Sequence, residues 1–83
     1  MKNLEFLITE ANSCKTIDDL IAFCREMIQL YTAGKQEQHL QMINAVEVRY
    51  RSGEGSQVYR ENYARNRLMS LIGNVCLQEK VIR

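Results

Sequence analysis

The chain contains no proline and only four glycines in 83 residues. Proline is the residue that most strongly interrupts a helix, because it lacks a backbone N–H and its ring clashes with the preceding turn. Alternation of apolar and polar residues over strand lengths is nearly absent, whereas apolar residues recur at spacings of three and four. The sequence therefore predicts an all-α fold, a small bundle of three to four helices in which residues 1–83 form one domain.

The first two predicted helices cover residues 4–12 and 17–32. Thr16 is placed to cap the second helix, with acidic residues in the first turn, and Gly34 is placed to close its end in a left-handed conformation. The second helix has the widest apolar face and is the predicted centre of the core. That face comprises Ile17, Leu20, Ile21, Cys24, Met27, Ile28 and Tyr31, widened by Phe23 and Leu30.

The third and fourth predicted helices cover residues 36–51 and the chain from 57 onward. Residues 52–56 have loop composition, and Ser56 can cap the helix that follows. Gly73 either ends the fourth helix or lies inside it, and the sequence leaves both possibilities open. The predicted apolar faces are Leu40, Ile43, Val46 and Tyr50 with Met42 beside them, then Ala64, Leu68, Leu71, Ile72 and Val75 with Val58 near the start.

Size and composition set the expected context of the domain. A chain of 83 residues buries only about 60–65% of its unfolded surface on folding, so we expect a homodimer to strengthen a thin core. Apolar runs are short, and no membrane span or secretion signal is expected. Three widely spaced cysteines, Cys14, Cys24 and Cys76, favour reduced thiols and the cytoplasm, although a secreted chain with one cross-chain disulfide is an alternative.

The residues from which enzymes build active sites are scarce. His39 is the single histidine, and the cysteine spacing matches no zinc pattern. Asp18 and Asp19 are adjacent, so a helix points them about 100° apart. The glycines of the 52–56 loop lack the lysine and spacing of a phosphate-binding loop. We therefore expect no enzymatic activity, no catalytic residues, no metal and no cofactor.

Charge is distributed unevenly along the chain. Residues 1–48 carry seven carboxylates and four cations, a net of −3, while residues 49–83 carry three carboxylates and seven cations, a net of +4. Clustered like charges project a field that partners of opposite sign feel. We therefore expect an interaction surface in the arginine-rich part of the chain.

The predicted interaction surface combines arginine and tyrosine on both sides of the 52–56 loop. Its members are Arg49, Arg51, Tyr59, Arg60, Tyr63 and Arg67. At 3.6 residues per turn the last four share one helix face, and Arg60, Tyr63 and Arg67 are the expected exposed anchors. A purely structural alternative has the arginines pairing with nearby carboxylates and the tyrosines packing half-buried.

Two functions use such a surface. The first is a small regulatory or adaptor protein that binds another protein, because tyrosine and arginine dominate interface energetics. The alternative is a nucleic-acid-binding transcriptional or nucleoid modulator, in which guanidinium groups hold phosphates and phenol rings stack on bases. Phosphate contacts would make binding depend steeply on salt.

A second route to DNA binding is a helix-turn-helix with residues 32–35 as its turn. The residues that would then face the bases are Gln38, His39, Gln41 and Asn44. Against this interpretation, Leu30 stands four residues before Gly34, where the motif requires a small residue, and the third predicted helix is not basic.

The segment Cys14–Leu20, Cys-Lys-Thr-Ile-Asp-Asp-Leu, resembles a short stretch near the first inter-helix turn of the enterobacterial haemolysin-expression-modulating family, which are small helical nucleoid-associated proteins. The resemblance covers about seven residues, half of which form a generic helix start. The Asp-His-Arg run of that family is not found, since the comparable place reads Glu47-Val48-Arg49. We draw no family assignment from it.

Overall fold

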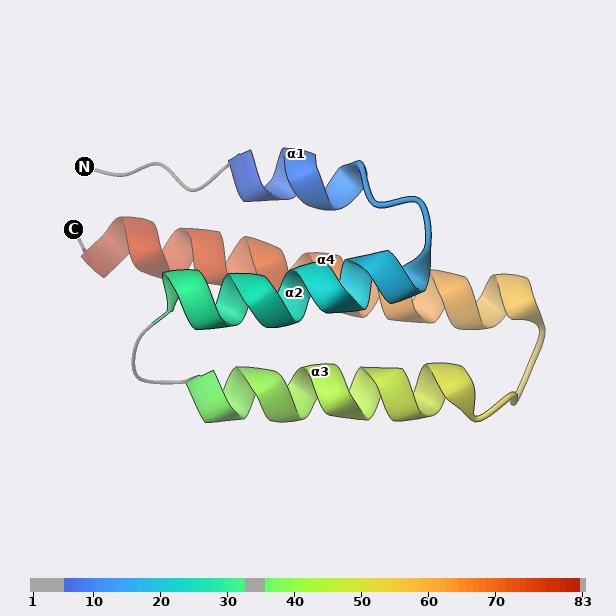
Figure 1. Ribbon diagram of the computed structural model, residues 1–83. Coiled ribbons are helices and arrows are strands. Elements are labelled where there is room, and N and C mark those ends of the chain that lie inside the picture. Colours follow the sequence, from blue (N-terminus) through green and yellow to red (C-terminus); the bar gives the residue numbers. More distant parts are fainter. Residues whose placement is uncertain (1–5, 33–35, 83) are drawn as a thin grey trace.

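Four helices form the computed structural model, which describes residues 6–32 and 36–82, with side chains described as far as Cys76. The helices are α1 (Phe6–Asn12), α2 (Ile17–Tyr31), α3 (Gln36–Arg51) and α4 (Gln57–Ile82). Successive helices alternate in direction, and α4 runs behind the other three (Figure 1). The all-α prediction is confirmed, and the described residues include no strand.

Local side-chain hydrogen bonds set two helix starts as the sequence predicts. Thr16 has an extended backbone, and its hydroxyl oxygen accepts a hydrogen bond from the Asp19 N–H at 3.0 Å. Ser56 does the same for the Tyr59 N–H at 3.1 Å. Each cap satisfies one of the N–H groups that have no partner inside the helix.

The end of α2 is closed by polar side chains. Thr32 is the C-cap with an extended backbone, and both its N–H and its hydroxyl donate to the Ile28 carbonyl. Gln36 Nε2 then donates to the Thr32 carbonyl at 2.9 Å. The predicted role of Gly34 lies outside the described residues.

The core lies between α2 and α4, each of which packs against all three other helices, whereas α1 and α3 do not contact one another. No polar or charged residue is buried among the described residues. Leu30 and Val58 were placed with the core by the sequence analysis, but they are 65% and 66% exposed. Leu30 lies about 200° around the helix from the buried Ile28, and Val58 lies in the first turn of α4. The buried side chains are Leu7, Ala11, Ile17, Leu20, Ile21, Cys24, Met27, Ile28, Ile43, Val46, Ala64, Leu68, Leu71, Ile72, Val75 and Cys76.

Helix α4 continues without interruption through Gly73. A glycine inside a helix costs about 1 kcal/mol relative to alanine. Burial of Val75 and Cys76 beyond it stabilises the longer helix, since burying one aliphatic side chain contributes about 1.5–3 kcal/mol. The free energy gained by packing therefore exceeds the cost of the glycine. Of the two possibilities that the sequence left open, the structure shows the single continuous helix.

Helices α2 and α3 run side by side in opposite directions (Figure 1). The two helices of a helix-turn-helix cross at about 90–120°. Asn44, one of the residues expected to face bases, instead accepts a hydrogen bond from Arg25 of α2 at 2.7 Å. The packing therefore does not support the helix-turn-helix interpretation.

Candidate interaction surface

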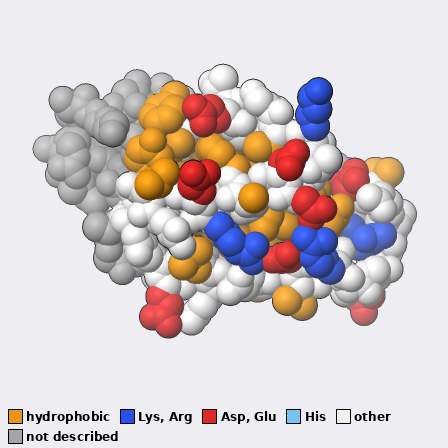
Figure 2. All heavy atoms as spheres, viewed as in Figure 1, with side chains coloured by type: hydrophobic (Ala, Val, Ile, Leu, Met, Phe, Trp, Pro, Cys, Tyr) orange, Lys and Arg blue, Asp and Glu red, His pale blue; other side chains and the backbone are white. Residues whose placement is uncertain are grey.

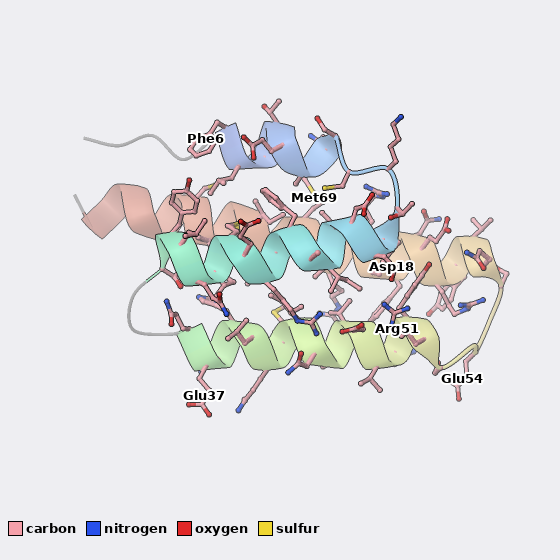
Figure 3. All side chains as sticks on the ribbon, in the orientation of Figure 1. Phe6, Asp18, Glu37, Arg51, Glu54 and Met69 are labelled. Atoms are coloured by element: carbon pink, nitrogen blue, oxygen red, sulfur yellow. The ribbon has the colours of Figure 1, made fainter. Side chains whose placement is uncertain are left out.

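On the side of α3 that faces α2, arginines pair with carboxylates. Arg51 bonds to Asp18 at the start of α2 and, through Nε at 2.9 Å, to Glu47. Figure 3 shows Asp18 and Arg51 between the two helices. Arg25 bonds to both Glu47 and Asn44. These hydrogen bonds lower the pKa of Glu47 and raise the pKa of Arg51. Arg51 therefore follows the structural alternative and joins the two helices.

On the side of α3 that faces α4, arginines lie on tyrosine rings. The guanidinium carbon of Arg49 is 5.1 Å from the centroid of the Tyr63 ring, and that of Arg67 is 5.5 Å from the same centroid. Both separations are within the range of cation–π attraction. Tyr63 is half-buried, whereas Arg49 and Arg67 are exposed. One ring of α4 thus orients two exposed cations.

Arg60 is less exposed than the sequence analysis expects of an anchor. Its Nη1 donates to the backbone carbonyl of Tyr50 at 3.1 Å, and its guanidinium carbon lies 5.9 Å from the centroid of the Tyr50 ring. The carbonyl belongs to the last turn of α3, where a cation complements the helix dipole. Arg60 Nε is buried and has no hydrogen-bond partner in the described part of the chain. Arg60 therefore joins α4 to the end of α3.

Tyr59 projects from the first turn of α4 with 55% of its surface exposed. Its ring lies over Gly55, where an added Cβ would stand 3.0 Å from the ring carbon Cδ2. Gly55 has a φ of +82°, a conformation that side-chain-bearing residues rarely adopt. A small hollow of about 110 Å³ opens beside this ring, lined by Arg49, Glu54, Gly55, Tyr59, Arg60 and Tyr63.

The structure thus brings together five of the six predicted site residues and separates one. We call Arg49, Tyr59, Arg60, Tyr63 and Arg67 the Arg/Tyr surface; Arg51 faces α2 instead. Arg49, Arg60 and Arg67 form no ion pair with a carboxylate in the described residues, although Glu54 lines the hollow beside Tyr59.

Two contributors were missed by the sequence analysis. Tyr50 was assigned to the core face of its helix, yet its ring and carbonyl hold Arg60. Gly55 was counted as a loop residue only. The contact of Tyr50 with an arginine could have been anticipated, because the carbonyl groups at the end of a helix have no partner within the helix and attract cations.

Two of the described cysteines, Cys14 and Cys24, have raised thiol pKa values. Burial raises the pKa of the Cys24 thiol to about 12. Partial burial, with Asp19 nearby, also raises the pKa of Cys14. Among the described residues no three His, Cys, Asp or Glu side chains gather as a metal site, and no helix there is long and apolar enough to cross a membrane.

Comparison of the chain with protein-family models, with curated proteins and with solved structures finds no match. The geometry of its own surfaces therefore carries the functional argument.

Proposed function

We propose that this chain is a small non-enzymatic regulatory or adaptor protein that binds an acidic segment of another protein through the Arg/Tyr surface. The observation that supports this is that the exposed guanidinium groups of Arg49 and Arg67 both lie on the Tyr63 ring and form no ion pair among the described residues. A guanidinium on a ring face keeps its N–H edge available and loses little further rotamer freedom when a carboxylate binds.

The size and charge of this surface favour a protein segment over a nucleic acid. The hollow is small, about 110 Å³, and the exposed Tyr59 ring adds an apolar contact beside it. Three unpaired arginines would give a DNA salt slope of about −2.7, far below that of a protein making six to ten phosphate contacts.

Nucleic-acid binding by the same surface is the second candidate. The exposed Tyr59 ring is the observation that favours it, because aromatic faces stack on unpaired bases of any sequence. This candidate predicts a preference for single strands over duplex.

The absence of enzymatic activity is part of the proposal. Cys14 and Cys24 each have a raised thiol pKa, which disfavours the thiolate that a nucleophile needs.

A fluorescence anisotropy titration tests the proposal with three labelled probes: an acidic peptide, a random duplex and a single strand, each at about 50 and 200 mM salt. We expect the peptide to bind best, and Arg49→Ala with Arg67→Ala to weaken it by about tenfold. We avoid Arg60→Ala because it would also release the Tyr50 carbonyl. Sedimentation of the free protein checks the expected homodimer.

Lys15→Ala is the control for the single variant Arg67→Ala, since each of these two variants removes one exposed cation. It should change peptide affinity by less than about twofold. Equal losses in the two variants would show general charge attraction and contradict the proposal. Tighter, steeply salt-dependent binding of the single strand would favour the second candidate.

A further inference from the structure

A second surface lies at the opposite end of the bundle, where α1 begins and α2 ends (Figure 1). A hollow of about 170 Å³ opens there between the two helices. Leu7 and Met27 form its buried floor, and Phe6, Phe23, Leu30 and Tyr31 stand around it. We call this hollow the α1–α2 groove. Unlike the Arg/Tyr surface, it is lined mainly by apolar side chains.

Two apolar side chains of the groove are exposed to solvent. Phe6 is 40% exposed and Leu30 is 65% exposed. The Phe6 ring is held in place, because it meets the Tyr31 ring edge-on with centroids 5.9 Å apart and planes at 77°. The described part of the chain thus leaves two apolar side chains of one hollow uncovered.

Two carboxylates stand beside these apolar side chains. Glu10 of α1 lies four residues after Phe6, and Glu26 of α2 lies four residues before Leu30, so each helix presents an acid and an apolar side chain on one face. Both glutamates are exposed, and neither carboxylate bonds to another described residue. Figure 2 shows hydrophobic side chains with acidic ones beside them on this face.

We infer that the α1–α2 groove docks a cationic amphipathic helix of a partner protein. Such a helix offers apolar anchors at i, i+3 or i+4 for a groove between two helices, and its Lys or Arg side chains reach carboxylates on the rim. A second copy docked through the same groove would bring Glu10 and Glu26 against themselves, which like-charge repulsion disfavours. The negative charge of Glu10 and Glu26 at the rim of the groove therefore favours a basic partner.

This inference goes beyond the proposed function because it uses separate residues of opposite charge. The Arg/Tyr surface lies at the end of α3 and the start of α4, and the groove lies at the other end of the bundle (Figure 1). One chain can then hold an acidic segment and a basic helix at the same time, which is the behaviour of an adaptor.

The test uses the full chain and a fluorescein-labelled peptide of about 18 residues, with leucine on one helical face and lysine on the other. A peptide of the same composition in scrambled order, without an apolar face, is the control probe. Anisotropy titration should show saturable binding of the amphipathic peptide, at least about tenfold tighter than the scrambled one.

Two pairs of variants locate the binding site. Glu10→Gln with Glu26→Gln should weaken binding by about fivefold, whereas Glu37→Gln with Glu54→Gln, which removes the same charge from exposed sites away from the groove (Figure 3), should change it by less than about twofold. Leu30→Ser should weaken binding by about tenfold, whereas Val48→Ser, at a 71% exposed site on α3, should have no effect.

Several results would overturn the inference. The first is equal binding of the two peptides, and the second is an equal loss of binding in the groove and control variants. The third is a dimer of the free protein that dissociates in the Leu30→Ser variant, which would place a second copy in the groove. The Arg49→Ala and Arg67→Ala variant should bind the basic peptide as the unmodified protein does. Failure of the groove and failure of the Arg/Tyr surface are therefore observed separately.

Discussion

The two sides of α3 use arginine in opposite ways. Toward α2, Arg25 and Arg51 are matched with Glu47 and Asp18 in a chain of ion pairs. Toward α4, Arg49 and its neighbours lie on tyrosine rings without a described carboxylate partner. Arg49 and Arg51 are two residues apart, and a helix turns them about 200° away from one another.

This difference shows why the charge split of the sequence does not map directly onto the surface. Part of the positive charge in residues 49–83 is neutralised by acidic groups from residues 1–48, and that part joins helices. Arg49, Arg60 and Arg67 are instead oriented by aromatic rings and form no ion pair among the described residues. An arginine count therefore overestimates the number of arginines without an ion pair, and the group that each arginine contacts distinguishes the two sets.

Removal of core side chains beneath the two sides should have the largest effect. Leu20 of α2 and Leu68 of α4 are fully buried, so Leu20→Ala and Leu68→Ala should each lower the free energy of unfolding by about 2–5 kcal/mol. Urea denaturation measures this. Val48→Ala at an exposed site is the control. A loss well below about 1 kcal/mol in either core variant would show that the ion pairs or ring contacts, and not the core, hold that side together.

Two glycines of the 52–56 loop give the next largest effect and separate strain from site geometry. Gly53 and Gly55 have φ of +83° and +82°, so alanine at either should cost about 1–2 kcal/mol. Only Gly55 has a neighbour within reach of an added Cβ, the Tyr59 ring at 3.0 Å. Gly55→Ala should therefore also weaken acidic-peptide binding, measured by anisotropy. Equal losses of peptide binding in Gly53→Ala and Gly55→Ala would show that the position of the Tyr59 ring does not contribute to binding by the Arg/Tyr surface.

Acid should selectively weaken the α2 side. Glu47 has a lowered pKa because it accepts hydrogen bonds from Arg25 and Arg51, so its stabilising contribution is complete above its ordinary pKa near 4.5 and is lost as pH falls through the lower folded value. Glu47→Gln should destabilise the fold by about 1 kcal/mol at pH 7, with the difference disappearing in acid. Thermal unfolding between pH 7 and 3 measures this, with Glu26→Gln as the control. A difference that does not decrease as the pH falls would contradict the ion-pair explanation.

Much of the fold was predictable because its determinants are local. The bounds of α3 match the predicted 36–51, and the Thr16 and Ser56 caps form as expected, since each depends on residues within one turn. The buried face of α4 follows from spacing alone. Leu30 was misplaced because helical spacing defines a face but not how far neighbouring helices cover its edge.

The candidate site was predictable only along one helix. The contact between Tyr63 and Arg67 spans four residues of α4 and follows from helical periodicity. The contacts of Arg49 with Tyr63, of Arg51 with Asp18 and of Arg60 with Tyr50 cross between elements, so they depend on how α3 docks against α2 and α4. No spacing rule distinguishes Arg49 from Arg51 before that docking is known.

The smallest expected effect is the one that compares the two sides most directly. Double-mutant cycles on Arg25 with Glu47 and on Arg49 with Tyr63 should each give a coupling energy of about 0.5 kcal/mol at low salt. The ion pair is partly exposed, so about 1 M salt, with a Debye length near 3 Å, should remove most of its coupling. The ring contact also gains from dispersion between the guanidinium group and the ring, which salt does not screen, so more of its coupling should survive. Equal salt sensitivity in the two cycles would mean that Arg49 is held by long-range charge and not by the Tyr63 ring, and the distinction between the two sides of α3 would fail.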